Sequence, residues 1–381
     1  MSAFISACLP EQAWLIALLQ ELVACESPST DRDALERCAS LLALRFTEAG
    51  ASVARVPAGS TADHVLATWP GAGPRVLLLG HFDTVWPVGQ LARMPVRMEN
   101  GRLYGPGVLD MKAGLAIGLL AARVLAAASD VATRPHLTFL ATSDEETGSH
   151  TSRGAIEDLA RRSDAVLVLE PALAGGAVKT SRKGVGEFEI VAHGIASHAG
   201  ADPGAGASAI QELARQVLAI ESLNDAATGV SVNVGVIEGG TRSNVVAERA
   251  RAVVDVRVAR AADAARVTQA FASLAPTDRR VRLEVSGRIN RPPMERTAGV
   301  AKLYELARDV AAAGGRALGE GATGGASDGN FTAALGVPTI DGLGAIGAGP
   351  HALDEHVVAA ELAPRAALVA GLIDRLGRRG A

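Results

Sequence analysis

Histidine and acidic residues stand directly after short apolar runs in this sequence, where buried strands are expected to end. His81 and Asp83 follow the apolar run at 75–80, in the stretch LLLGHFDTV. Loops beyond the strand ends of α/β sheets gather ligands, and there an imidazole can bind a metal while a nearby carboxylate fixes its tautomer. An ordinary strand can also end in polar residues such as these, so this pair alone predicts no site.

A second candidate is Asp110, in GPGVLDMKAG at 105–114, just before a long predicted helix. An Asp at the start of a helix is most often its N-cap. Its two carboxylate oxygens are nevertheless suited to span two metal ions, and the flanking glycines let the backbone approach a ligand closely. Asp110 is therefore a candidate metal bridge.

Three consecutive acids, Asp144, Glu145 and Glu146, follow another apolar run in TSDEETGS. Clustered carboxylates repel and raise one another's pKa unless a cation neutralises them. A solvated acidic loop is the plainer interpretation, but these acids come after a buried strand. Glu170 ends a further apolar run in VLVLEP. Three predicted strand ends thus carry potential ligands, which favours a metal site.

Two histidines lie near the C-terminus in GAGPHALDEH. His351, beside the Gly-Pro turn, is the better ligand candidate. His356 leads toward the last predicted helix and is expected to be structural.

The elements that must position these residues alternate between apolar runs and helical periodicity, which indicates an α/β sheet buried on both faces. The expected strands are 64–69, 75–80, 136–142, 165–169 and 336–340, and the expected helices are 11–25, 33–49, 111–129, 152–161, 298–313 and 360–377. Asn100-Gly101 predicts a hairpin turn. We expect a catalytic domain of residues 1–182 and 292–381 with a mixed, mainly parallel sheet.

A different pattern between these two segments indicates an inserted domain at 183–291. Its predicted strands are 186–193, 230–238, 246–258 and 281–285, and its predicted helices are 206–222 and 262–275. The resulting order, β-α-β-β-α-β, is the ferredoxin-like α+β pattern.

Composition narrows the function. The 381 residues carry a net charge of −4 and only 3% aromatic residues, so the chain lacks the positive field and stacking surfaces of a nucleic-acid-binding protein. Cys8, Cys25 and Cys38 form no C-x-x-C pair and are expected to pack in a reducing compartment. No signal-like n-region and no apolar run near ~18 residues is apparent. We therefore expect a cytoplasmic protein with no membrane contact.

Taken together, the motifs GHFDTV, GPGVLDMKAG, DEETGS, LEP and a late GPH, in this order and spacing, resemble those of the cocatalytic di-zinc peptidases and deacylases. That superfamily contains aminoacylase and bacterial glutamate carboxypeptidase. The resemblance covers almost the whole chain, inserted domain included.

The resemblance implies two zinc ions per chain, although cobalt and manganese also suit such mixed ligands. One ion would be held by His81, Asp110 and Glu170, and the other by Asp110, Glu146 and His351. Glu145, next to a ligand, would be the general base, and Asp83 would support His81.

The inserted domain resembles the family's lid and dimerisation domain, which predicts a homodimer. In ASHAGADPGAGASA, His198 matches the histidine that the family uses on the tetrahedral intermediate, in the partner's active site; without the family, it reads as a loop residue capping the next helix. Arg242 and Asn244 in GGTRSN, and Arg291 in INRPP, are implied in substrate binding. Only four of 37 basic residues are lysines, so a single arginine is weak evidence.

Two other functions fit parts of the sequence. GASDG at 325–329 satisfies G-x-S-x-G, with Ser327 as nucleophile, Asp341 or Asp354 as acid and His351 or His356 as base, but no apolar strand precedes it. A noncatalytic metal-binding scaffold is the third class, and none of the expected ligands or the base is missing.

We therefore predict a metal-dependent hydrolase that cleaves the amide bond of N-acyl or peptidyl amino acids with a free carboxylate. The Pro in GPG, Glu rather than Asp at position 170, and Arg291-Pro292 make glutamate carboxypeptidase the nearest resemblance. Deacylases resembling acetylornithine deacetylase and succinyl-diaminopimelate desuccinylase are the close alternative.

Overall fold

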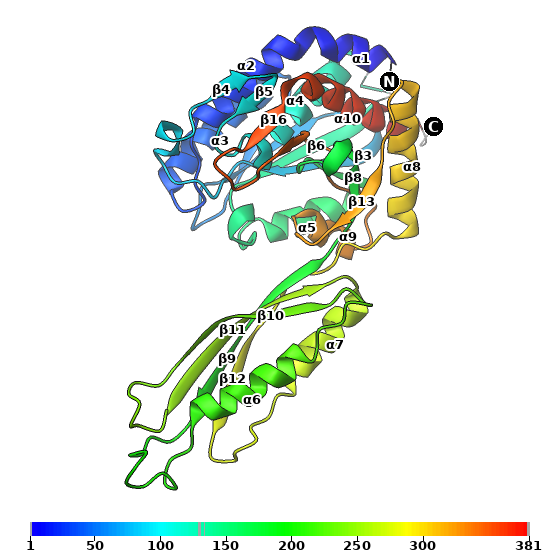
Figure 1. Cartoon of the computed structure of the whole chain (residues 1–381). Coiled ribbons are helices and arrows are strands. Elements are labelled where there is room, and N and C mark those ends of the chain that lie inside the picture. Colours follow the sequence, from blue (N-terminus) through cyan, green and yellow to red (C-terminus); the bar gives the residue numbers. More distant parts are fainter. Residues whose placement is uncertain (1, 129–130, 133, 379–381) are drawn as a thin grey trace. The chain divides into compact units, whose positions relative to one another are not determined.

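Two compact units make up the chain in a computed structural model that describes residues 2–128, 131–132 and 134–378 (Figure 1). The first unit comprises Met1–Ser181, Arg296–Ala322 and Ser327–Ala381. The second comprises Arg182–Glu295 and Thr323–Ala326. The short return segment 323–326 belongs with the second unit because Lys183 N donates to the carbonyl of Thr323, 3.0 Å away, and the Arg182 side chain donates to the carbonyl of Gly325, 3.1 Å away.

The first unit is built on a six-stranded sheet with the order β1-β2-β6-β3-β7-β14. Its strands are β1 (Ser52–Val56), β2 (His64–Trp69), β3 (Gly73–His81), β6 (Pro135–Thr142), β7 (Ala165–Val168) and β14 (Thr339–Ile340). β3 runs parallel to both β6 and β7, and β7 runs parallel to β14. β1 and β2 are antiparallel additions. The expected mixed, mainly parallel sheet is confirmed.

Side chains of the central strand explain why the sheet is buried on both faces. Val76 and Leu78 join the large core cluster on one face, whereas Leu77 and Leu79 join a smaller cluster on the other. Successive strand residues point to opposite faces, so a continuous apolar run needs cover on both.

Helices supply that cover. α4 (Ala113–Ala128) and α10 (Leu362–Gly377) contact each other over the larger cluster, and α5 (Arg153–Arg161) and α9 (Gly329–Ala334) lie over the smaller one. The remaining helices of this unit are α1 (Ser2–Cys8), α2 (Gln12–Ala24), α3 (Arg32–Glu48) and α8 (Ala298–Ala313). Asp31 directly precedes α3, and its side chain accepts from Ala34 N and caps the first turn.

A small sheet brings the C-terminal segment beside the residues that precede Asp110. Its order is β15 (Gly347–Ala348), β16 (His356–Val358), β5 (Arg102–Tyr104) and β4 (Arg97–Glu99). Asn100 and Gly101 turn between β4 and β5 with φ of 48° and 74°, as the hairpin prediction requires. His356 lies in β16 and pairs with Tyr104, so its expected structural role is confirmed. Another small sheet joins β8 (Val178–Arg182) to β13 (Glu320–Thr323).

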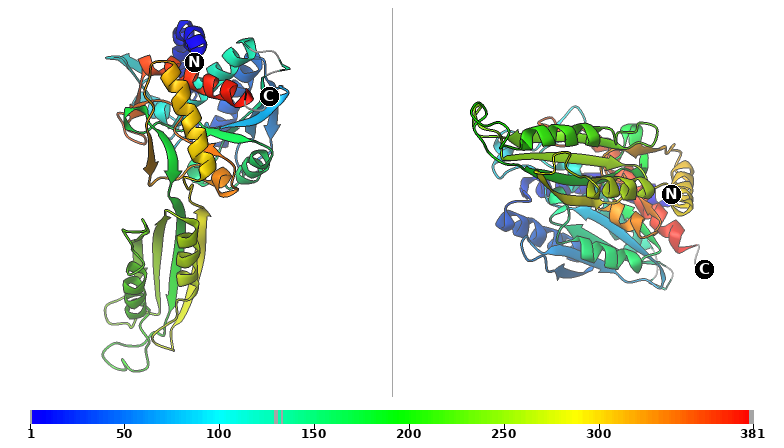
Figure 2. Two further views of the ribbon diagram at one scale, coloured as in Figure 1. Left: turned by 90° about the vertical axis from the view of Figure 1, so that its right-hand side faces the viewer. Right: turned by 90° about the horizontal axis from the view of Figure 1, so that it is seen from below.

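The second unit has the predicted β-α-β-β-α-β order: β9 (Gly184–His193), α6 (Ala209–Glu221), β10 (Ser231–Gly239), β11 (Arg249–Val258), α7 (Ala261–Ala272) and β12 (Arg282–Arg291). The strands form one antiparallel sheet in the order β10-β11-β9-β12. Figure 2 shows these strands side by side, with α6 and α7 packed along them. Phe188, Leu213 and Phe271 belong to the core of this unit.

Two helical stretches, Ala3–Ala24 and Val108–Ala128, are long and apolar enough to cross a membrane by length and composition. The expectation that no run approaches such a length is wrong. In the second stretch, 78% of the 18-residue apolar window is buried inside the protein, as in a core helix. The first lies near the N-terminus and is 28% buried.

Candidate active site

The predicted metal ligands of the first unit come together at one edge of its sheet. β3 ends at His81, and Glu146 and Glu170 follow β6 and β7, which flank β3 in parallel. Since the carboxyl ends of parallel strands meet at the same edge, the chain folds these three residues into one place. Asp110 reaches it from the turn before α4, and His351 from the loop between β15 and β16.

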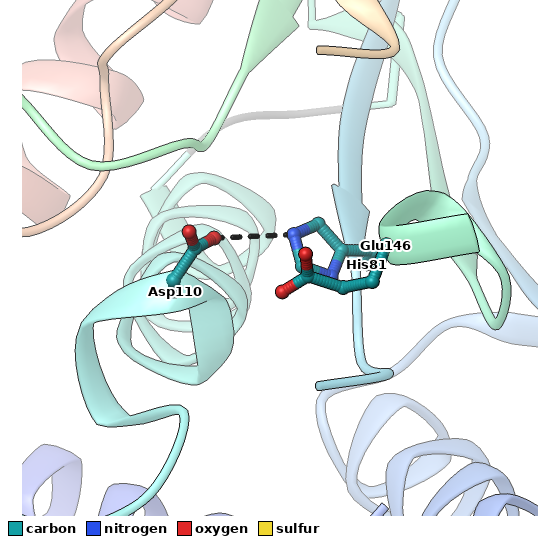
Figure 3. A group of neighbouring side chains, drawn as sticks. All are labelled: His81, Asp110 and Glu146. Carbon is teal, nitrogen blue, oxygen red and sulfur yellow. Dashed lines mark ion pairs between the residues drawn. The ribbon is translucent and has the colours of Figure 1, made fainter. Parts of the chain in front are cut away.

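Asp110 stands between the two histidines. Its Oδ1 lies 3.3 Å from His81 Nε2, and its Oδ2 lies 3.4 Å from His351 Nε2. Glu170 Oε1 is 3.5 Å from His81 Nε2, and Glu146 Oε1 is 3.2 Å from His351 Nε2. Figure 3 shows the side chains of Asp110, His81 and Glu146 converging from separate elements. Each oxygen of Asp110 therefore lies near one histidine, and each histidine also lies near one further carboxylate.

Exposure differs from one end of this cluster to the other. The His81 side chain is 2% exposed, whereas the His351 side chain is 49% exposed. His351 has a φ of 62°, in the left-handed region that costs a non-glycine residue energy and often occurs at functional sites. The cluster is thus closed at His81 and open to solvent at His351.

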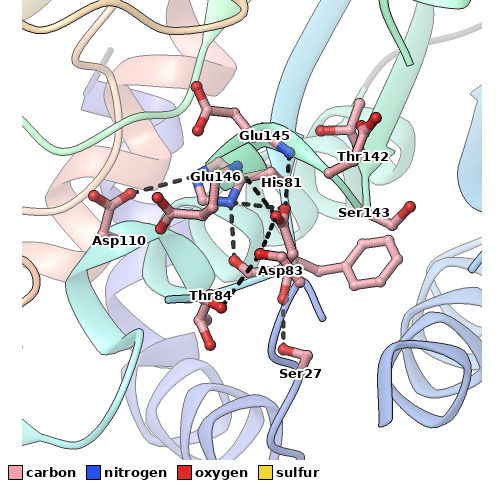
Figure 4. Close-up of polar contacts among 12 residues, drawn as sticks. Ser27, His81, Asp83, Thr84, Asp110, Thr142, Ser143, Glu145 and Glu146 are labelled. Atoms are coloured by element: carbon pink, nitrogen blue, oxygen red, sulfur yellow. Dashed lines mark hydrogen bonds and ion pairs between the residues drawn. The ribbon is translucent and has the colours of Figure 1, made fainter. Parts of the chain in front are cut away.

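Asp83 connects His81 to the acidic loop. Its buried carboxylate lies 3.3 Å from His81 Nδ1. The same carboxylate accepts hydrogen bonds from the backbone N–H groups of Glu145 and Glu146, at 3.2 and 3.1 Å (Figure 4). It also accepts from Ser29 Oγ at 2.8 Å. One carboxylate therefore fixes both the His81 ring and the segment that carries the two glutamates.

The surroundings of His81 Nε2 show whether these residues fit a metal ion. This buried nitrogen makes no hydrogen bond, whereas Nδ1 contacts the carbonyl of Asp83 at 3.0 Å. A ring that donates from Nδ1 presents a lone pair at Nε2, and that lone pair faces two carboxylates. Such an arrangement is repulsive without a cation, and its nitrogen and oxygen donors suit zinc and related divalent ions.

The pKa shifts within the cluster also indicate that it can bind a cation. Burial lowers the pKa of His81, but surrounding carboxylates, Asp110 foremost, outweigh it and hold that pKa well above its usual value. Asp110 and Glu146 raise the pKa of His351 to about 10. Burial raises the pKa of Glu146, although His351 opposes the shift. Protons therefore compete with a cation for these side chains, and metal binding weakens as pH falls.

Comparison with known proteins identifies the family to which the chain belongs. The model of "Peptidase family M20/M25/M40" matches residues 77–375. Carboxypeptidase G2 of Pseudomonas sp. (strain RS-16) is 31% identical over 377 residues, which cover 96% of this chain and 90% of that protein. Succinyl-diaminopimelate desuccinylase of Xanthomonas oryzae pv. oryzae (strain PXO99A) is 31% identical over 362 residues, 89% of this chain and 93% of that protein.

The chain belongs to the M20/M25/M40 peptidase family. It is a metal-dependent peptidase or amidohydrolase, and the superfamily resemblance drawn from its motifs is confirmed. Aminopeptidase PepT from Bacillus cereus ATCC 10987 has the same fold, with a TM-score of 0.80, 24% identity and coverage of 96% of this chain and 98% of that one. A "dinuclear metal binding peptidase" of the M20 family from Bacillus subtilis matches with a TM-score of 0.71, 16% identity and coverage of 95% and 97%.

The remaining predicted site residues of this family member lie in its second unit. His198 is exposed, and its Nδ1 accepts from Gly200 N and Ala201 N, both at 3.1 Å, so it shapes its own turn. Asn244 is adjacent, because its carbonyl accepts from Ala199 N at 2.9 Å. Arg242 is exposed and lines a pocket with Arg280 and Ser208. Arg291 stands at the end of β12. None of these four is among the residues that converge on Asp110.

Ser327 is not arranged as the nucleophile of a serine hydrolase. It is fully buried, its Oγ donates directly to Asp341 Oδ2 at 2.6 Å, and it accepts from Gly329 N at 3.1 Å. Both candidate bases are engaged elsewhere: His351 faces the carboxylates of the metal cluster, and His356 Nδ1 faces the carbonyl of Asp354 at 2.8 Å. That hypothesis is wrong, since a buried serine whose hydroxyl donates to a carboxylate instead of a histidine is not poised as an exposed nucleophile.

Sequence reasoning missed several groups that hold the site. Asp144 holds the acidic loop, because its Oδ2 accepts from Thr151 N at 2.6 Å and from Thr151 Oγ1 at 2.8 Å. Glu355, four residues after His351, accepts hydrogen bonds from the backbone just before and at Asp110. No signal in the sequence points to Glu355, because its burial within a polar segment is visible only in the folded chain.

Proposed function

We propose that this protein hydrolyses the amide bond of N-acyl or peptidyl amino acids that carry a free carboxylate, in the manner of a glutamate carboxypeptidase. The observation that carries the proposal is the double contact of Asp110, one oxygen toward each histidine. The relatives support the substrate class, since their names specify a carboxypeptidase and the removal of a succinyl group from an amino acid. A deacylase specificity like the second is the alternative.

We assign the metal ligands to two sites, both for zinc. His81, Asp110 and Glu170 would hold one ion, and Asp110, Glu146 and His351 would hold the other. When bound, the two divalent ions would supply a water of lowered pKa and an electrophile for the scissile carbonyl. The chain's own residues then decide where the protons go.

Glu145 is the group that moves protons in this proposal. It follows β6, and its backbone N–H is fixed by Asp83. Figure 4 shows its carboxylate directed away from Asp83, on the other side of the loop from that hydrogen bond. As a carboxylate outside the ligand set, it accepts the proton of the attacking water and passes it to the leaving amine.

The residues of the second unit supply binding in this proposal. Arg291 receives the substrate carboxylate, because the planar fork of arginine binds a carboxylate through two parallel hydrogen bonds. Arg242 and Asn244 contact the remainder of the substrate, and His198 stabilises the charge that develops on the carbonyl oxygen.

Hydrolysis of a substrate panel tests the function. Metal-free protein reconstituted with zinc, cobalt or manganese is expected to release amino acids from peptidyl and N-acyl amino acids. Activity should vanish with a chelator and return with metal. Preference for C-terminal glutamate identifies a glutamate carboxypeptidase, and preference for succinylated diamino acids identifies the deacylase. Turnover that persists in chelator, or a lack of turnover on the whole panel, contradicts the proposal.

We also propose a homodimer formed through the second unit, with His198 acting in the partner's active site. Arg291 pairs with Val185 near the start of β9, whereas His198 follows β9 beyond its end at His193. At about 3.4 Å per residue these ends are roughly 25–30 Å apart. One small substrate cannot touch both residues of the same chain, but it can touch Arg291 of one chain and His198 of another.

The surface proposed for this dimer is the edge of the sheet formed by β10. β10 has one neighbouring strand, and Val236 and Ile237 on it are 42% and 59% exposed. Ile210 and Leu218 on α6 are also exposed. An unpaired edge strand with apolar side chains readily accepts another strand.

Ile237→Lys is expected to convert a dimer into a monomer and to abolish most activity, because a charge on the edge blocks pairing and removes the partner's His198. Light scattering after gel filtration gives the oligomeric state. Met98→Lys, a matched change at an exposed position of the first unit, should leave a dimer. A wild-type monomer with full activity contradicts the dimer.

The location proposed is the cytoplasm. Cys8, Cys25 and Cys38 are free thiols, two of them buried, as in proteins of reducing compartments.

A further inference from the structure

Glu355 is a buried carboxylate with four N–H donors and no exposed surface. Its Oε1 accepts from Leu109 N at 2.8 Å and from Asp110 N at 3.1 Å. Its Oε2 accepts from Gly107 N at 2.9 Å and from Trp86 Nε1 at 2.9 Å. Each oxygen is thus saturated by two donors.

These donors come from different segments, and each segment carries residues of the site. Trp86 lies three residues after Asp83 and five after His81. Leu109 and Asp110 belong to the turn before α4. Glu355 itself lies four residues after His351, in the loop that ends at β16. One side chain therefore joins the three segments that bring His81, Asp110 and His351 together from distant parts of the sequence.

We propose that Glu355 is a positioning residue that sets the backbone of the Asp110 turn in its metal-binding geometry before any metal binds. The proposal rests on the proposed function for the identity of the ligands. The proposal extends the proposed function by naming the group that holds the Asp110 carboxylate between the two histidines.

The chemistry of the four donors requires a carboxylate. Three are backbone N–H groups, which have no partner in a helix because they lie in the turn before α4. An amide has one accepting oxygen and an NH2 group that donates. Glutamine at this position therefore satisfies one pair of donors and sets its NH2 against the other pair. Buried donors left unpaired raise the free energy of this conformation. The segment is therefore expected to shift and to move the Asp110 carboxylate relative to both histidines.

Zinc titration of metal-free protein against a chromophoric chelator tests the proposal. Glu355→Gln is expected to bind zinc about 10–100-fold more weakly than wild type, the usual effect of losing a group that orients a ligand. Trp86→Phe removes the one donor that is not on the backbone and should change the affinity several-fold less than Glu355→Gln.

Glu212→Gln is the matched control. Glu212 is equally buried, in the second unit, and also accepts from two backbone N–H groups, Thr277 at 2.9 Å and Asp278 at 3.1 Å. It should lower the melting temperature of metal-free protein without changing zinc affinity. If Glu355→Gln behaves as Glu212→Gln does, losing melting temperature only, Glu355 has a purely structural role and the proposal is overturned.

Amide hydrogen exchange in wild type gives a second measurement that needs no variant. The amides of Gly107, Leu109 and Asp110 should be protected in metal-free protein and gain little on zinc addition. Free exchange at these amides until zinc binds overturns the proposal, even if Glu355→Gln does not fold. Wild type that binds no zinc at all contradicts the proposed function instead, so the two failures are distinguishable.

Discussion

Glu145→Gln is expected to lower kcat by roughly 10²–10⁴-fold, the range that positioned proton transfer contributes, while the protein keeps its full metal content. Glutamine preserves the backbone N–H that Asp83 accepts at 3.2 Å, so the loop should not move. What the substitution removes is the ability to accept a proton from water. Steady-state kinetics together with metal analysis of the same sample measure both parts.

The neighbouring carboxylate is the control for this experiment. Glu146 Oε1 lies 3.2 Å from His351 Nε2, so Glu146→Gln should lose metal and activity together. Glu145→Gln should lose activity alone. An active Glu145→Gln enzyme removes this residue from proton transfer, and a metal-depleted one makes it a ligand.

Much of the fold follows from local patterns. The run Val76–Leu79 is apolar at every position, which is possible only for a strand covered on both sides, and the structure divides it between two core clusters. β1 (Ser52–Val56) escaped prediction because it is a half-exposed edge strand with little apolar signal. β8 and β13 were missed for a related reason, since a two-stranded sheet that pairs residues more than 100 positions apart leaves no local period.

The candidate site was partly predictable for a topological reason. His81 and Glu170 each follow a continuous apolar run, and parallel strands must bring such residues to one edge. His351 follows no such run, and only the resemblance pointed to its partners. The contacts of Asp83 with two backbone N–H groups, and of Glu355 with three, were beyond sequence reasoning because backbone donors carry no sequence signature.

In the second unit, the sequence predicted the order of elements but not the separation of its functional residues. Arg291 and His198 are both implied in substrate handling, yet they belong to opposite ends of β9. Motifs specify residue types, whereas the register of an antiparallel sheet specifies how far apart they lie. That distance is the reason to look for a second chain in the reaction.

Asp110→Asn is expected to have the largest effect on metal binding, because Asp110 is the one side chain that serves both proposed sites. Asparagine keeps an oxygen toward one histidine but presents an NH2 group to the other, where a cation needs a lone pair. The substitution also removes a negative charge that helps to neutralise two cations. We expect metal content to fall from two ions per chain to at most one, with turnover close to background.

His351→Ala separates the bridge from a single-site ligand. It removes only the exposed end of the cluster, so His81, Asp110 and Glu170 should still hold one ion with nearly wild-type affinity. Asp110→Asn should weaken that ion as well, since the Asp110 oxygen 3.3 Å from His81 Nε2 is part of the same carboxylate. Metal analysis after dialysis, at the same pH for both variants, gives the comparison. Two ions retained by Asp110→Asn would mean that the two sites do not share Asp110, and both ions lost by His351→Ala would mean that His351 is not a ligand of one site alone.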